Sequence, residues 1–183
     1  MRIIKLNEQS RANILADLLK RDPNNYSAYE GTVQEIVDDV RARGDEALFE
    51  YTKKFDGAEL SADNIRVTQA EIQEALSQVD PNLLAVMKKS MKNIREYHEK
   101  QKQYSWFDSK PNGTILGQKV TALSSVGVYV PGGKAAYPSS VLMNIIPAEV
   151  AGVEKIVMVT PPGKDGKVNP VTLIAAHLAG ATE

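Results

Sequence analysis

Apolar residues in the first part of the chain recur every three or four positions, which is the spacing of one face of a helix. The pattern predicts helices over five stretches, at residues 14–19, 33–40, 48–55, 72–79 and 84–98. Residues 64–67 are predicted to form a short strand between the third and the fourth of these helices. This part of the chain is therefore expected to be a helical assembly.

Capping signals mark the ends of several of these helices. Gly44 stands where a helix would end in a left-handed residue, and Asp45 can cap the helix that follows. Thr68 and Glu71 have the spacing of a capping box. Asp80, followed by a proline, combines an N-cap with the residue type favoured at the first helical position.

The pattern changes in the second part of the chain, where short β-rich runs alternate with helical stretches. Strands are predicted over 120–123, 126–130 and 155–160; helices are predicted from Ser139 or Ser140 to about 150 and from 169 to 178, with Gly180 as a stop. This βαβα order is typical of an α/β fold with a parallel sheet covered by helices. Such sheets bind ligands at the carboxyl ends of their strands, so we expect a site in the loops after Val130 and Thr160.

The last predicted helix should lead into a third strand, and the few residues after Gly180 do not supply one. An open parallel sheet of two strands leaves an edge that folded proteins usually cover or extend. We therefore expect the chain to be a fragment of a longer protein, truncated within its sheet.

Composition divides the chain near residue 110. Residues 1–110 hold 36 of the 45 charged residues and only 3 of the 12 glycines, whereas residues 111–183 hold the other 9 charged residues and 9 glycines. A charged, helix-forming segment is thus expected to join an apolar, turn-rich one.

Charge and hydropathy exclude several classes of protein. The net charge of −1 lacks the basic excess of a general nucleic-acid binder. No apolar run approaches the ~20 residues of a membrane span, and the amino terminus lacks the apolar stretch of a signal peptide. The absence of cysteine excludes disulfides, thiolate metal sites and a cysteine nucleophile. We expect a cytoplasmic protein with no nucleic-acid partner and no membrane partner.

The glycine-rich stretch at 127–134 invites two interpretations. It resembles a phosphate-binding loop, but an extra glycine separates Gly132 from Lys134, and Ala135 stands where a serine or threonine would hold magnesium. The stretch can be a tight turn at a strand end, or it can let a nucleotide or small substrate approach the backbone while Tyr129 stacks on its ring. The spacing leaves both interpretations open.

The two histidines and a cluster of basic residues are expected to have structural roles. His98 lies on the apolar stripe of its helix and His177 near the end of another, so they are a poor basis for a metal site, which needs three or four converging ligands. Acidic residues dilute the basic cluster that follows residue 87, so a solvated helix face is favoured over a nucleic-acid surface. That cluster comprises Lys88, Lys89, Lys92, Arg95, Lys100 and Lys102.

Several longer motifs resemble one known family. They are VGVYVPGG at 126–133, YPSSVLMN at 137–144, RARGDEAL at 41–48 and TPP at 160–162. In this order and at these spacings they resemble histidinol dehydrogenases, and the resemblance covers essentially the whole chain.

The resemblance implies a fold, a reaction and cofactors. The fold would be similar to that of aldehyde dehydrogenases, with residues 1–110 a mainly helical segment with a short strand. Residues 111–183 would be the first βαβα part of a Rossmann-like domain, incomplete at its C-terminus. The family's enzymes are homodimers that oxidise L-histidinol through L-histidinaldehyde to L-histidine with zinc and two NAD⁺.

The resemblance also implies site residues. Tyr129 matches a tyrosine that contacts NAD, Pro131 and Pro161 match prolines near its adenine, and Phe55 matches an aromatic residue near the same pocket. Ser139 matches a serine near the substrate. No catalytic residue and no zinc ligand is assigned here, because the family carries them beyond the position of residue 183. The chain alone is therefore expected to be inactive; the alternative is a non-catalytic nucleotide-binding or dimerisation module.

Overall fold

The structure is a computed structural model that describes residues 5, 7–12, 26–132 and 136–183. It divides into two compact units, Met1–Ala47 and Leu48–Glu183. The first predicted helix, at 14–19, lies outside the described residues. None of the helices in the described part of the chain has the length and apolar character needed to cross a membrane.

The described part of the first unit is dominated by helix α2 (Ser27–Arg43), which confirms the helical period found there. None of its side chains is buried, and Val33 is 55% exposed. The N–H of Gly44 donates to the Val40 carbonyl at 2.8 Å. Gly44 has the positive φ that was expected, 63°, but its ψ of −134° lies outside the left-handed helical region, so the prediction of a left-handed cap is wrong in ψ.

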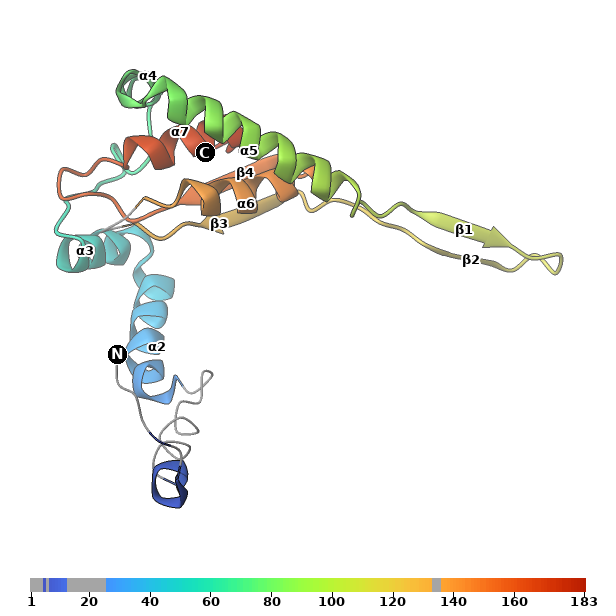
Figure 1. Cartoon of the computed structure of the whole chain (residues 1–183), viewed down its shortest axis with the longest axis horizontal. Coiled ribbons are helices and arrows are strands. Elements are labelled where there is room, and N and C mark those ends of the chain that lie inside the picture. Colours follow the sequence, from blue (N-terminus) through green and yellow to red (C-terminus); the bar gives the residue numbers. More distant parts are fainter. Residues whose placement is uncertain (1–4, 6, 13–25, 133–135) are drawn as a thin grey trace. The chain divides into compact units, whose positions relative to one another are not determined.

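The second unit contains the sheet and most of the helices (Figure 1). Helix α3 begins in the first unit and continues into the second. In chain order the elements are α3 (Asp45–Phe55), α4 (Gln69–Gln78), α5 (Pro81–Glu99), β1 (Trp106–Ser109), β2 (Ile115–Gln118), β3 (Ser125–Tyr129), α6 (Pro138–Val150), β4 (Lys155–Val159) and α7 (Pro170–Ala179). The fold is thus a mixed one of helices and small sheets.

Strands β3 and β4 pair in parallel, as the βαβα order predicts. Tyr129 lies opposite Val159, and Val128 lies opposite Met158. The carboxyl ends of the two strands therefore meet at one edge of the sheet, where the chain enters the two loops expected to bind a ligand.

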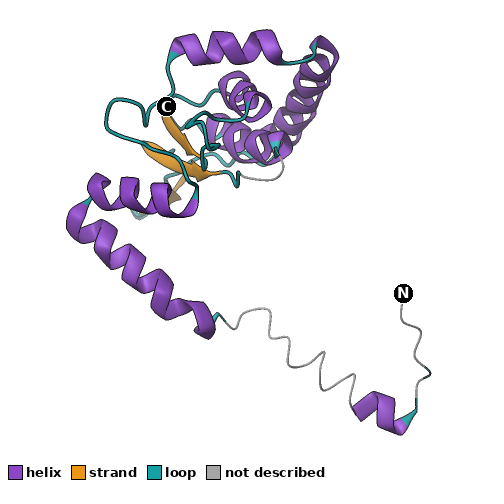
Figure 2. Ribbon diagram, turned by 90° about the vertical axis from the view of Figure 1, so that its left-hand side faces the viewer, coloured by secondary structure: helices purple, strands orange, loops and turns teal. Residues whose placement is uncertain are grey.

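The buried core lies between this sheet and helices α6 and α7, which pack on each other. Helix α4 packs on α7, and α5 packs on α6; Figure 2 shows helices gathered beside the strands. Side chains alternate along β3, so that Val128 and Val130 are buried whereas Tyr129 between them is 64% exposed. The largest fully buried side chains are Leu142, Ile145, Ile146, Ile156, Ile174, Val130 and Val141.

Three of the predicted helix caps are formed, at Thr68, Asp80 and Gly180. Thr68 and Glu71 make both hydrogen bonds of the capping box at the start of α4. The side chain of Asp80 accepts from the N–H of Asn82 before α5. Gly180 closes α7 in the left-handed conformation, with φ 97° and ψ 25°. These three caps confirm the predicted helix ends. They were predictable because a cap depends on only a few neighbouring residues.

Two predicted strands are wrong. At 64–67 the side chain of Asn64 accepts from the N–H of Ser61 at 2.6 Å and donates to the Glu59 carbonyl, which makes a turn instead. At 120–123 the N–H of Val120 donates to the hydroxyl of Ser105 at 2.8 Å, and no partner strand lies beside it among the described residues. An apolar, β-rich sequence favours a strand, but a strand also needs a neighbouring strand to pair with, and these two segments have none within the part of the chain that the structure describes.

The hairpin β1–β2 was not predicted. Its strands are antiparallel, and residues 110–114 join them: the N–H of Lys110 donates to the Thr114 carbonyl, and the N–H of Gly113 donates to the Lys110 carbonyl. The place where composition changes is therefore the turn of a hairpin. Every residue of both strands is exposed, including Trp106 and Phe107.

Candidate functional site

The loops after β3 and β4 touch each other at the carboxyl edge of the sheet. A Cβ atom on Gly132 would lie 2.8 Å from the carbonyl oxygen of Pro161 and 3.3 Å from the hydroxyl oxygen of Thr160. Real Cβ atoms do not approach backbone this closely, so only glycine allows this contact. The glycine therefore serves the close packing of the two loops.

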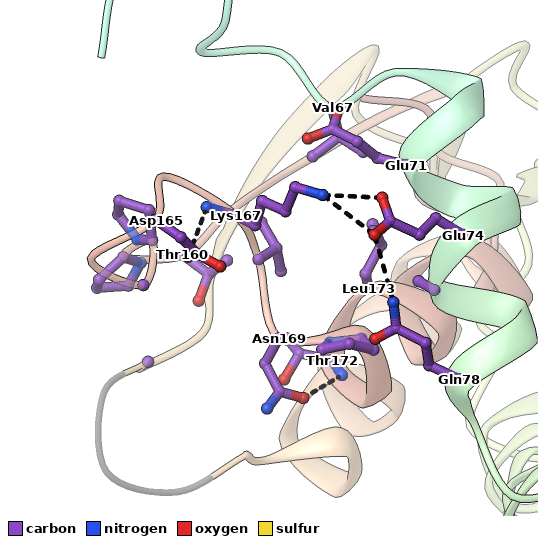
Figure 3. A pocket seen from close by; sticks show the side chains of 17 residues that line it. Val67, Glu71, Glu74, Gln78, Thr160, Asp165, Lys167, Asn169, Thr172 and Leu173 are labelled. Atoms are coloured by element: carbon purple, nitrogen blue, oxygen red, sulfur yellow. Dashed lines mark hydrogen bonds and ion pairs between the residues drawn. The ribbon is translucent and has the colours of Figure 1, made fainter. Parts of the chain in front are cut away.

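A cavity of about 430 Å³ opens beside this contact. Its walls are the loop after β4, the first turn of α7 and one face of α4, and Figure 3 shows the side chains that line it. The side chain of Asn169 caps α7 by accepting from the N–H groups of Val171 and Thr172. The same cap thus shapes one wall of the cavity.

Charged groups on both sides of this cavity are paired. Lys167 from the loop donates to both carboxylate oxygens of Glu74 on α4, at 2.8 and 3.1 Å, and this hydrogen-bonded ion pair raises the pKa of Lys167. Hydrogen bonds from the backbone and the hydroxyl of Thr68 lower the pKa of Glu71. Both groups are therefore charged at neutral pH.

A second cavity, of about 320 Å³, shares part of its lining with the first. Pro161 and Pro162 line both cavities, so the loop after β4 is a shared wall. Helix α3 contributes Leu48 and Thr52, and α7 contributes His177. Its lining mixes apolar side chains with polar and charged ones, among them Asp56 and Glu71.

Tyr129 presents an open aromatic surface at the end of β3. The residue is 64% exposed, and Val159, which lies opposite it on β4, is 56% exposed. A Cβ on Gly127, two residues earlier on the same side of the sheet, would meet no atom within 4 Å. The side chain of Tyr129 is therefore accessible, and the space above Gly127 is open.

The structure brings together some of the residues that the sequence singled out. Pro161 lines both cavities, and Tyr129 and Pro131 lie at the adjoining end of β3. Phe55 is exposed at the end of α3 and stacks on Tyr51, with ring centroids 5.8 Å apart. Of the five residues that the sequence singled out, only Pro161 lines these cavities; the linings of both lack Tyr129, Pro131, Phe55 and Ser139. The binding roles assigned to these residues remain predictions.

The sequence did not single out Glu74 and Lys167, which are 93 positions apart. A charged residue is common in the kind of segment that holds each of them, so neither position indicates a special role. Only the packing of α4 against α7 brings the two side chains together. No local signal could have predicted this pair.

The two histidines lie apart from any metal-like cluster. Within the described residues, no group of three or more histidine, aspartate or glutamate side chains converges as a metal site needs. His98 is half-buried and meets the ring of Tyr97 edge-on at 5.3 Å. In the basic cluster of α5, Lys92 pairs with Glu96. These contacts agree with structural and solvated roles.

Comparison with known proteins assigns the fold and motifs to one family. The family model for histidinol dehydrogenase matches residues 19–183. A histidinol dehydrogenase from Bacillus subtilis (strain 168) is 60% identical over 149 residues, 81% of this chain and 34% of its own length. One from Heliobacterium mobile is 56% identical over 151 residues, 82% of this chain and 35% of its own length.

A solved structure extends the likeness to the fold. The crystal structure of histidinol dehydrogenase from Elizabethkingia anophelis matches with a TM-score of 0.77 at 35% identity, over 84% of this chain and 35% of that one. The chain thus spans about a third of the length of the relatives it matches.

Proposed function

This chain belongs to the histidinol dehydrogenase family, and we propose that it forms the amino-terminal part of an enzyme that oxidises L-histidinol through L-histidinaldehyde to L-histidine. The observation that carries the proposal is the family match over residues 19–183, which includes the exposed Tyr129 at the end of β3. On this proposal the β3-α6-β4-α7 region is the first part of a Rossmann-like domain. The helical and β-rich segments on either side of residue 110 are then its two structural divisions.

The residues at the carboxyl edge of the sheet fit a dinucleotide. NAD⁺, when bound, supplies the acceptor for the hydride that leaves the alcohol and then the aldehyde. The exposed ring of Tyr129 offers a stacking surface. Pro131, Pro161 and Phe55 would complete the adenine side, and Ser139 would lie near the substrate.

Zinc has no convergent ligand set among the described residues. We therefore assign no step to zinc in this chain, and propose that its ligands and the catalytic residues belong to the portion of the family's length that the chain does not span. The chain alone would then hold part of the cofactor site without turnover. The complete enzyme would be a cytoplasmic homodimer.

A segment exchange tests this function. The 149 residues of the Bacillus subtilis relative that match this chain are replaced by the residues of this chain, and histidinol-dependent NADH formation is measured. We expect the chimera to be active and Tyr129→Ala to raise the KM for NAD⁺ more than it lowers kcat. A folded chimera without activity would contradict the proposal and favour a non-catalytic binding or dimerisation module.

A further inference from the structure

The loop between β4 and α7, residues 160–169, controls the shape of both cavities. Pro161 and Pro162 line both of them, so a shift of the loop changes the walls of both cavities. The loop also meets the chain after β3, through the close approach of Pro161 to Gly132. The position of the loop is therefore coupled to that of Gly132, three residues after Tyr129.

The outer half of this loop is closed on itself by hydrogen bonds that converge on one residue. The N–H of Gly163 donates to the carbonyl of Lys167 at 2.8 Å, and the N–H of Lys167 donates to the carboxylate of Asp165 at 3.1 Å. The N–H of Gly166, which has φ 75°, donates back to the Gly163 carbonyl at 2.9 Å. Residues 163–167 thus form a compact turn, and Lys167 is its closing residue.

The same lysine fastens the turn to a distant helix. Its ammonium group reaches both carboxylate oxygens of Glu74 on α4, and Glu74 also accepts from Gln78 one turn later (Figure 3). About half of each side chain in the ion pair is exposed. Exposed ion pairs contribute little to the free energy of global unfolding. We therefore expect this pair to affect the position of the loop rather than the stability of the whole chain.

We propose that Glu74 and Lys167 are positioning residues for nucleotide binding: their ion pair holds the loop that carries Pro161 and Pro162 against the end of β3. Neither residue contacts the ligand. The inference rests on the proposed function, because it assigns the loop a part in the cofactor site.

Ligand titrations separate this role from a direct contact. Glu74→Gln and Lys167→Met are each expected to weaken binding of NAD⁺ by about threefold, a size set by the weakness of exposed pairs. The uncharged ligand adenosine should lose affinity by the same factor, since the loop acts on shape. Exchanging the two charges, in the double variant Glu74→Lys with Lys167→Glu, should restore binding. Lys92→Met, which removes an ion pair within α5, should leave binding unchanged.

Three results would overturn the inference. A loss of affinity confined to NAD⁺ would mean that Lys167 contacts a phosphate. Unchanged affinity in both single variants would mean that the ion pair has no part in nucleotide binding. Amide exchange of Gly163 without ligand gives a test that does not depend on the proposed function. We expect faster exchange at Gly163 in Glu74→Gln and unchanged exchange at Gly180; unchanged exchange at Gly163 contradicts the inference even if no nucleotide binds.

Discussion

The carbonyl oxygen of Glu183 accepts a hydrogen bond from the N–H of Met158 at 2.8 Å. One step earlier, the Ile156 carbonyl accepts from the N–H of Thr182 at 2.8 Å. Bonds of this kind on alternate residues of β4 form the start of a parallel ladder on the edge opposite β3. The sequence led us to expect no third strand after Gly180, and the structure shows these two residues already following the edge of β4.

The hydroxyl of Thr182 strengthens this edge. It accepts from the N–H of Ile156 and donates to its carbonyl, both at 3.0 Å. Thr182→Val keeps the shape and removes both bonds, and we expect a loss of about 1 kcal/mol in the free energy of unfolding. Amide exchange at Ile156 should accelerate. Thr121→Val, in an exposed segment, is the control, and equal effects of the two variants would contradict this role.

The capping box of α4 should make stability depend on pH. Bonds from Thr68 hold the pKa of Glu71 below its ordinary value of 4.5. The contribution of this carboxylate is therefore present above pH 4.5 and is lost as the pH falls through the lower pKa of the folded state. Urea unfolding of the wild type and Glu71→Gln should show a stability difference that shrinks toward acidic pH. A difference independent of pH would contradict the assignment.

The interior of α6 should be sensitive to loss of volume. Ile145 is fully buried against the sheet and α7, so Ile145→Ala should lower the free energy of unfolding by ~2–5 kcal/mol. Val86→Ala, at a position that is 62% exposed, should change it by less than ~0.5 kcal/mol. Chemical denaturation measures both, and a small effect at Ile145 would mean that the core is packed differently.

The contact between the two strand-end loops should tolerate no side chain at Gly132. In Gly132→Ala the new methyl group would press on the Pro161 carbonyl, and we expect a cost of ~1–3 kcal/mol in thermal unfolding. Gly127→Ala is the matched control, because its Cβ would enter open space. Similar stability of the two alanine variants would show that the loops do not touch in this way.

The sequence predicted features that depend on neighbouring residues better than features that depend on residues far apart in the chain. The helix starts at Thr68 and Asp80 were predictable because a cap depends on residues two or three positions away. The parallel pairing of β3 with β4 was predictable because two buried-looking strands flanked a helix. The strand predicted at 120–123 failed because a strand also needs a distant partner, and the structure gives Val120 a serine hydroxyl instead.

The hairpin and the ion pair show two different limits. The Asn112-Gly113 step is a common hairpin turn signal, so the hairpin β1–β2 could have been predicted from the sequence. Glu74 and Lys167 carry no local signal, because their contact exists only once α4 has packed on α7. The loops of the candidate site were predictable from topology, whereas the residues that fasten them were not.

The most direct test of the central claim is the affinity of this chain for NAD⁺, measured by titration calorimetry on the wild type and on Tyr129→Ala. Stacking of a base on an aromatic side chain contributes ~1–3 kcal/mol, so Tyr129→Ala should weaken binding by about fivefold or more. Tyr104→Ala removes another exposed tyrosine and should bind as the wild type does. Equal binding of NAD⁺ by the wild type and by Tyr129→Ala would contradict a cofactor site at the end of β3.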